Sequence, residues 1–128
     1  MPISHLGIST TDIATSKKFY DAALAPLRYK IALQFNDGKV LGYGDEKGPS
    51  FWVHEVTDLA EKSGNVHVAF DAKSEEEVKA STTQRCIAAG GKDNGAPGPR
   101  PQYTATIMAP LSTTLKENIE AVYFAPIA

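Results

Sequence analysis

The chain has 128 residues, 42% of them hydrophobic and 22% charged, which is the composition of one globular domain able to bury a core. Its net charge of -2 argues against nucleic acid or an anionic membrane as the main partner, because either requires a basic face. No apolar run approaches the ~20 residues of a membrane-spanning helix, and the first residues lack a signal-peptide pattern. Together with the single cysteine, Cys86, this predicts a cytoplasmic protein.

The first half predicts a strand, a helix and three more strands. Ile3–Thr10 alternates as a strand and places His5 on the face opposite Leu6. Asp12 is the expected N-cap of a helix that Pro26 ends. Three strands are then expected at Arg28–Phe35, Lys39–Gly44 and Ser50–Val56, joined by turns at Asn36–Gly38 and Asp45–Pro49.

The second half repeats this order. Asn65–Asp71 reads as a strand with Val68 and Phe70 on its packing face and His67 on the other. Ser74 with Glu77 has the capping-box pattern and opens a second helix. The remaining elements are a rigid Gly/Pro loop at Lys92–Pro101 and closing strands at Tyr103–Ala109 and Asn118–Ala125.

Two spacings indicate that the halves are a duplication. His67 minus His5 is 62, and Ser74 minus Asp12 is also 62. In both copies a histidine on an alternating strand comes seven residues before a helix-capping residue. We therefore expect one domain, residues 1–128, made of two modules at about 1–58 and 64–128.

The paired histidines are candidate metal ligands. A single histidine on a strand is more often a structural residue than a ligand, but equivalent positions of a repeat change that balance. If pseudo-symmetry brings the two imidazoles to one point, a divalent metal between them is a common solution. We predict that His5 and His67 are ligands, with a neutral histidine pair as the alternative.

Two carboxylates extend this candidate site. Glu120 lies among apolar residues, so it either faces solvent on an edge strand or points at a charged partner. The repeat places its counterpart near position 120 − 62 = 58, and Glu55 is close, on the same face as Phe51 and Val53. Two histidines and two glutamates would suit Fe(II), Mn(II), Ni(II) or Zn(II). His54 points to the opposite face and is expected on the surface or in packing.

Four more residues are candidates for contact with a substrate. Arg100 and Tyr103 border the Gly/Pro loop and would hold an anionic or carbonyl group, the alternative being a solvated arginine and a packing tyrosine. Trp52 is expected to pack on a helix or at a dimer contact rather than stack on a ligand. Met108 is expected in the pocket wall or the core.

The chain resembles the vicinal oxygen chelate superfamily, most of all its small glyoxalase/bleomycin-resistance/dioxygenase-type members. The resemblance is carried over nearly the whole chain by SHLGISTTDIATSKKFYDAAL, GNVHVAF, AAGGKDNGAPGPRPQY and IEAV. It implies an α+β fold in which two βαβββ modules form an incomplete mixed β-barrel around a metal, often in a homodimer. It also implies that His5, His67 and Glu120 are metal ligands.

Two departures from the family pattern bear on function. Family spacing places the fourth ligand nearer Val53 than Glu55, and TATIMAPLSTTLKEN lacks the aromatic strand and D-P-D-G-N turn usual in relatives. Three functions therefore stay open. The first is a metal-dependent lyase, isomerase or dioxygenase acting on a small substrate with vicinal oxygens, with Glu120 as ligand or proton shuttle. The second is a non-enzymatic protein that sequesters a small molecule, and the third is a degenerate member that only dimerises.

Overall fold

The computed structural model describes residues 3–58, 66–74, 76–77, 89, 91–93, 98–99, 106–113 and 117–124. Side chains are described for residues 3–58, 68–74, 76–77 and 89. Within these ranges, no helix combines the length and the apolar character that crossing a membrane requires.

The first half forms a four-stranded sheet with one helix. Its strand order is β1-β4-β3-β2, with β1 parallel to β4 and the other pairs antiparallel. The elements in chain order are β1 (Leu6–Thr10), α1 (Ile13–Leu24), the 3-10 helix η1 (Ala25–Leu27), β2 (Lys30–Phe35), β3 (Val40–Asp45) and β4 (Gly48–Glu55). This confirms the predicted βαβββ order, with boundaries shifted by a few residues.

The second half repeats this topology. Its sheet has the order β5-β9-β8-β6, with β5 parallel to β9 as β1 is to β4, and β7 also pairs with β8. Its strands are β5 (Val66–Asp71), β6 (Gly91–Asp93), β7 (Gly98–Pro99), β8 (Thr106–Thr113) and β9 (Glu117–Phe124). Glu76 and Glu77 are helical, and the rest of the predicted second helix lies outside the described residues. The repeated module is therefore confirmed at the level of strand order and direction.

The Gly/Pro loop differs from its prediction. Gly91–Asp93 and Gly98–Pro99 form short strands that pair with β8. The strand expected at Tyr103–Ala109 is found at Thr106–Thr113, so the polar Ser112 and Thr113 belong to it. Both differences have one cause, since β8 continues as long as β6, β7 and β9 supply backbone partners.

Side-chain caps begin both helices at the predicted residues. The Asp12 carboxylate accepts hydrogen bonds from the Thr15 hydroxyl (2.6 Å) and the Thr15 N–H (3.1 Å), and these bonds lower the pKa of Asp12. In the second half the Glu77 N–H donates to Ser74 Oγ (3.2 Å), while Glu77 Oε2 accepts from the Lys73 N–H (2.7 Å). The duplicated spacing therefore marks duplicated caps.

The core lies between α1 and the first sheet, and the second half contributes to it. Tyr20, Tyr43 and Phe51 are almost fully buried and contact one another. Burial raises the pKa of Tyr43, whose hydroxyl donates to Asp21 Oδ1 at 3.0 Å. From β5, Phe70 packs edge-on against Phe51, with ring centroids 5.0 Å apart, and Val68 also contacts this core. This confirms the packing face predicted for β5.

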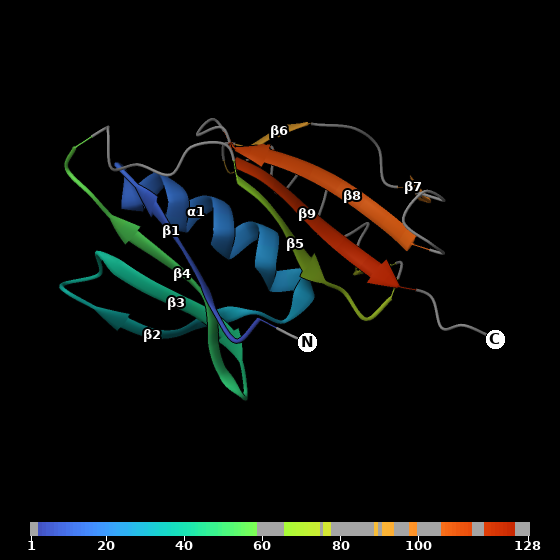
Figure 1. The fold of residues 1–128 in the computed structure, drawn as a ribbon, viewed down its shortest axis with the longest axis horizontal. Coiled ribbons are helices and arrows are strands. Elements are labelled where there is room, and N and C mark those ends of the chain that lie inside the picture. The colour runs from blue at the N-terminus through green and yellow to red at the C-terminus, as the bar shows by residue number, and fades with distance from the viewer. Residues whose placement is uncertain are drawn as a thin grey trace.

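The two sheets are not joined into a closed barrel. β1 and β5 are edge strands of their respective sheets, and the interacting Phe51 and Phe70 rings come from the two sheets. In Figure 1, α1 lies behind the first sheet and the second sheet lies to the right. The arrangement is the incomplete mixed barrel that the sequence predicts.

Candidate functional site

The two faces of the first sheet have different surroundings. Along β4, Phe51 and Val53 are buried against the core on the α1 side. The intervening residues, Trp52 and His54, therefore belong to the face turned away from the helix. We call this second face the open face, and it is the face that the viewer sees in Figure 1.

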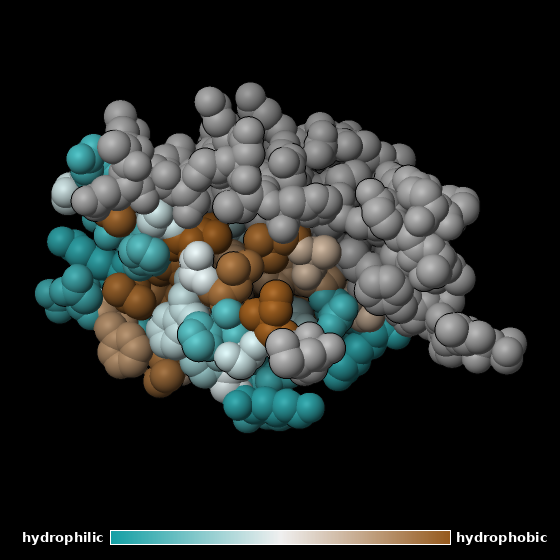
Figure 2. Space-filling model, in the orientation of Figure 1, coloured by the Kyte–Doolittle hydropathy of each residue, from teal (hydrophilic) through white to brown (hydrophobic). Residues whose placement is uncertain are grey.

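Two stacked aromatic rings dominate the open face. Phe35 and Trp52 lie with ring centroids 5.9 Å apart and ring planes 14° from parallel, and we call this pair the aromatic platform. Phe35 is 54% exposed and the neighbouring Leu33 is 46% exposed. Figure 2 shows hydrophobic residues gathered over the strands of this sheet. An apolar surface that the core does not use is a candidate binding surface.

The tryptophan ring is held flat because Gly42 lies beneath it. A Cβ added at Gly42 would be 2.7 Å from Trp52 Cζ3, closer than any side chain can be. The same addition at Gly7, on the other side of Trp52, would meet Trp52 Cβ at an ordinary 3.8 Å. Gly42 is therefore required by the position of the ring, and Gly7 is not.

His54 adds a polar group to the open face. It is exposed and lies opposite Val40 on β3 and Ser9 on β1, on the sheet face that carries Phe35. The prediction of a surface position for His54 is confirmed. Of the two positions expected for Trp52, packing on a helix is wrong, because the ring lies on the open face and stacks on Phe35. A dimer contact of Trp52 stays a prediction.

Glu55 has a contact that its proposed ligand role does not anticipate. It shares a face with Phe51 and Val53 as predicted, but that face is the one covered by α1. Ile13 is the first residue of α1, and its backbone N–H donates a hydrogen bond to Glu55 Oε2 (3.1 Å). The positive end of the helix stabilises a carboxylate there. A metal-binding Glu55 would have to leave this contact, and its role as a ligand stays a prediction.

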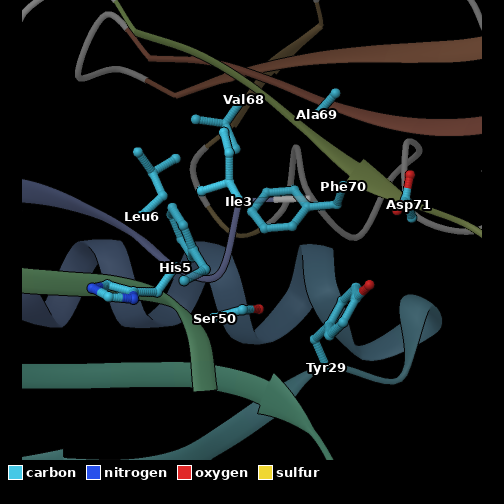
Figure 3. Close-up of a pocket in the computed structure, with 10 residues that line it drawn as sticks. Ile3, His5, Leu6, Tyr29, Ser50, Val68, Ala69, Phe70 and Asp71 are labelled. Carbon is cyan, nitrogen blue, oxygen red and sulfur yellow. The ribbon is translucent and has the colours of Figure 1, made fainter. Parts of the chain in front are cut away.

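His5 lies just before β1 with its side chain exposed. Ser4 Oγ and His5 Nδ1 are 2.9 Å apart, which leaves Nε2 as the ring atom available to a ligand. In Figure 3 the His5 ring points away from Tyr29 and Asp71. The predicted strand began at Ile3, whereas pairing with β4 begins only at Leu6.

His67 and Glu120 are placed by the backbone of the second sheet. His67 pairs with Asn118 and Ala69 pairs with Glu120, so positions 67 and 120 belong to the same face of adjacent strands. Their side chains lie outside the described part of the structure. The register places these two positions side by side, and their roles as metal ligands stay predictions.

The register identifies the first-half counterpart of Glu120. Gly7 and Ala69 are equivalent, since 69 − 7 = 62, and Gly7 pairs with Trp52 as Ala69 pairs with Glu120. The counterpart of Glu120 is therefore Trp52, three residues before Glu55. An aromatic ring lies where the duplication would supply a second carboxylate.

The remaining candidates fall outside what the structure describes. Arg100 and Tyr103 lie outside the described residues, and Met108 is placed only by its pairing with Val122 and Gly98. Among the described residues, no three His, Cys, Asp or Glu side chains are grouped closely enough to hold a metal ion. The described donors therefore do not make a four-ligand centre. Of the four predicted ligands, His5, His67 and Glu120 stay candidates for a metal.

Solved structures share this architecture. A glyoxalase/bleomycin resistance protein from Albidiferax ferrireducens T118 is 25% identical, with a TM-score of 0.74 over 95% of this chain and 98% of that one. The chain belongs to the vicinal oxygen chelate superfamily.

Two more distant structures show the same fold. A glyoxalase-related enzyme from Fulvimarina pelagi is 17% identical over 100% of this chain and 93% of that one, with a TM-score of 0.71. Lactoylglutathione lyase from Agrobacterium tumefaciens is 13% identical over 95% and 92% of the two chains, with a TM-score of 0.66. No family model and no curated protein sequence matches this vicinal oxygen chelate chain.

Sequence reasoning missed Phe35, Leu33 and Gly42 as parts of the candidate site. A signal was present, because Leu33 and Phe35 alternate in a strand that precedes a tight turn and both are large apolar residues. What the sequence lacked was the pairing of Leu33 with Gly42 and of Gly42 with Trp52. That row of residues places Trp52 beside Leu33 on the open face, next to Phe35.

Proposed function

We propose that this protein binds a small molecule with a flat apolar or aromatic part on the open face of the first sheet. The aromatic platform is the proposed contact surface, with His54 as the polar group beside it. One observation carries the proposal. Trp52, at the register position equivalent to Glu120, presents a ring in place of a carboxylate.

The energetics of the platform favour this function. Phe35 and Leu33 are about half exposed, so their burial in the free protein stabilises the fold little. A ligand ring that covers these side chains would remove their apolar surface from water. The contact between aromatic rings adds about 0.5–1.5 kcal/mol to the binding free energy that the buried area supplies. Binding sites for small molecules commonly combine such apolar walls with a few polar groups. The bleomycin-resistance part of the name of the Albidiferax structure is compatible with binding without reaction.

The fluorescence of Trp52 tests the proposal, because it is the only tryptophan in the chain. The planar quencher 4-nitrophenol is titrated against the protein, with non-planar cyclohexanol as competitor. We expect saturable quenching that cyclohexanol does not reverse. The Phe35→Leu variant should bind the quencher about two- to tenfold more weakly, the size of one aromatic contact.

A matched control separates site effects from general ones. Lys17→Ala changes a residue of α1, whose side chain is 49% exposed and pairs with Asp21, and should leave the titration unchanged. Quenching of the wild type that rises linearly, as for free tryptophan, would contradict the proposal. So would equal affinity in wild type and Phe35→Leu.

A second candidate function is metal-dependent chemistry on a substrate with vicinal oxygens. It is favoured by one observation, the shared face of positions 67 and 120 on β5 and β9. His5, His67 and Glu120 would hold the ion, and a divalent metal would act there as a Lewis acid. With Trp52 at the equivalent register position and Glu55 bound to the helix, the described residues supply no donor at the fourth position.

Metal analysis decides between the two candidates. Protein is incubated with Ni(II), Mn(II), Fe(II) or Zn(II), desalted and analysed for metal content. Near-stoichiometric metal that is lost in His5→Ala and His67→Ala supports the enzyme. Protein that stays metal-free supports the binding protein. We also propose a homodimer, which sedimentation equilibrium tests by giving the mass of one or two chains.

A further inference from the structure

A cavity lies at the seam between the two halves, away from the aromatic platform. It has a volume of about 320 Å³, and we call it the seam cavity. β1, β4 and the segment before β2 form one side of it, and β5 forms the other. The described residues that line it are Ile3, His5, Leu6, Tyr29, Ser50, Phe51, Val68, Ala69, Phe70 and Asp71.

The seam cavity is separate from the aromatic platform. Its β4 wall is made of Ser50 and Phe51. The Phe51 ring belongs to the α1 side of the first sheet, whereas Trp52 belongs to the open face. None of the platform residues, Phe35 and Trp52, lines it. A ligand in this cavity would therefore contact different residues from a ligand on the platform.

The cavity is apolar along its length and polar at one end. Leu6, Val68 and Phe70 form its apolar part, and Leu6 remains 39% exposed beside it. Figure 3 shows the Tyr29 hydroxyl and the Asp71 carboxylate at one end, with Leu6 and Val68 toward the other. The Tyr29 and Phe70 rings are 6.2 Å apart between centroids and flank the polar end.

The electrostatics of that end favour a cation. The pKa of Tyr29 is raised, first by burial and then by the negative charges of Asp71, Asp45 and Glu77. Asp71 is exposed and is the only carboxylate among the described residues of the cavity wall. Within the described part of the chain, the Asp71 carboxylate takes part in no side-chain hydrogen bond or ion pair. Aromatic rings beside a carboxylate add a cation–π contribution.

We propose that the seam cavity binds a small amphiphilic amine, with its ammonium group at Asp71 and Tyr29 and its apolar part against Val68 and Phe70. A volume of about 320 Å³ suits a ligand with one ring and a short chain. Arg28, Lys30 and Lys73 line the neighbouring hollow together with Asp71. The comparison of a cationic with an anionic ligand is therefore the decisive one.

Three probes of one shape test the sign of the charge. We titrate 2-phenylethylamine, 2-phenylethanol and 3-phenylpropionate into isotopically labelled wild-type protein and follow backbone amide shifts near Ser50, Phe70 and Asp71. The amine should bind at least about fivefold more tightly than the alcohol, as expected for a charge-assisted hydrogen bond at a half-open site. The carboxylate should bind most weakly.

Variants locate the site. Asp71→Asn should reduce amine affinity about five- to tenfold and leave the alcohol unchanged. Leu6→Trp, at an exposed rim position, should fill the cavity and weaken both probes. Asp37→Asn is the matched control, because Asp37 lies in the β2–β3 turn and lines neither the cavity nor the neighbouring hollow. It should change amine affinity less than twofold.

The results that overturn the proposal are equally specific. Three results with the wild-type protein would each contradict the proposal. The amine and the alcohol would bind with equal affinity, the carboxylate would bind most tightly, or no probe would give a saturable shift. That ranking needs no variant, so a variant that fails to fold leaves the test intact. Trp52→Leu should not alter amine binding, which keeps this result independent of the platform.

Discussion

The β1–β4 pair and the β5–β9 pair are two copies of one arrangement with different side chains. Both are parallel pairs at the edge of a four-strand path, and both place a small residue, Gly7 or Ala69, at the equivalent position. Opposite that residue the first pair has Trp52 and the second has Glu120. The backbone repeat is thus retained while the chemistry of the two faces has diverged.

The residues around position 52 fit an indole better than a carboxylate. A carboxylate at position 52 would need a charged partner or solvent, whereas an indole needs a flat neighbour and room beneath it. Phe35 supplies the neighbour and Gly42 supplies the room. The first half therefore presents an aromatic surface, whereas the second places positions 67 and 120 on one face of adjacent strands.

The largest expected effect is the loss of stability when a core aromatic residue of either half is replaced by alanine. Phe51→Ala, at a residue 4% exposed, should lower the free energy of unfolding by about 3–5 kcal/mol through cavity formation. Phe70→Ala should cost about half as much, because Phe70 is only partly buried against the same core. Urea unfolding measures both. A larger loss for Phe70→Ala would mean that the seam, not the first sheet, dominates stability.

The two glycines beside Trp52 offer a sharper comparison. Gly42→Ala should displace the indole, lower stability by about 1–3 kcal/mol and shift the Trp52 emission maximum. Gly7→Ala should change stability by less than about 0.5 kcal/mol, since its second-half counterpart is already Ala69. Emission spectra and denaturation curves of the two variants check this. Equal effects would show that the ring does not lie on Gly42.

The duplicated caps should have similar effects. Asp12→Ala and Ser74→Ala should each lower the free energy of unfolding by about 1 kcal/mol, because each leaves a helix N–H without its acceptor. Thermal unfolding of the two variants provides the measurement. Thr15→Ser keeps a hydroxyl that can donate to Asp12 and serves as the control.

The smallest expected effect is a pH dependence at the contact between the halves. The Lys73 N–H, and then Arg28, lower the pKa of Glu77. Its contribution to stability is therefore full above the ordinary carboxyl pKa and is lost as the pH falls through the lower folded value.

Glu77→Gln tests that dependence. It should flatten the acid limb of the stability–pH profile by less than about 1 kcal/mol, since Arg28 is largely exposed. Lys17→Ala, which breaks the exposed Lys17–Asp21 pair on α1 and keeps the Asp21 carboxylate that accepts from Tyr43, is the comparison. An identical flattening in both variants would remove any special role for the contact between the halves.

The sequence predicts the fold well because the fold rests on local and repeated signals. The alternation near His5 and His67 and the caps at Asp12 and Ser74 recur at one spacing, and the structure confirms the strands and caps. The Asn36–Gly38 turn also forms as expected, with positive φ at all three residues.

The candidate site was less predictable because it depends on register between distant strands. From Gly7 to Trp52 is 45 residues, whereas from Ala69 to Glu120 is 51, so a constant offset of 62 points beyond the true counterpart. Six extra residues before β9 moved the expectation toward Glu55. Only the hydrogen-bonded pairing of β1 with β4 identifies Trp52.

Trp52 occupies the register position that is equivalent to Glu120 in the other half. Calorimetric titration of Zn(II) into wild type, Trp52→Glu and Glu55→Gln tests it most directly. We predict weak binding to the wild type, at least about tenfold tighter binding to Trp52→Glu, and no change in Glu55→Gln. Tight binding to the wild type that Glu55→Gln abolishes and Trp52→Glu does not improve would contradict it.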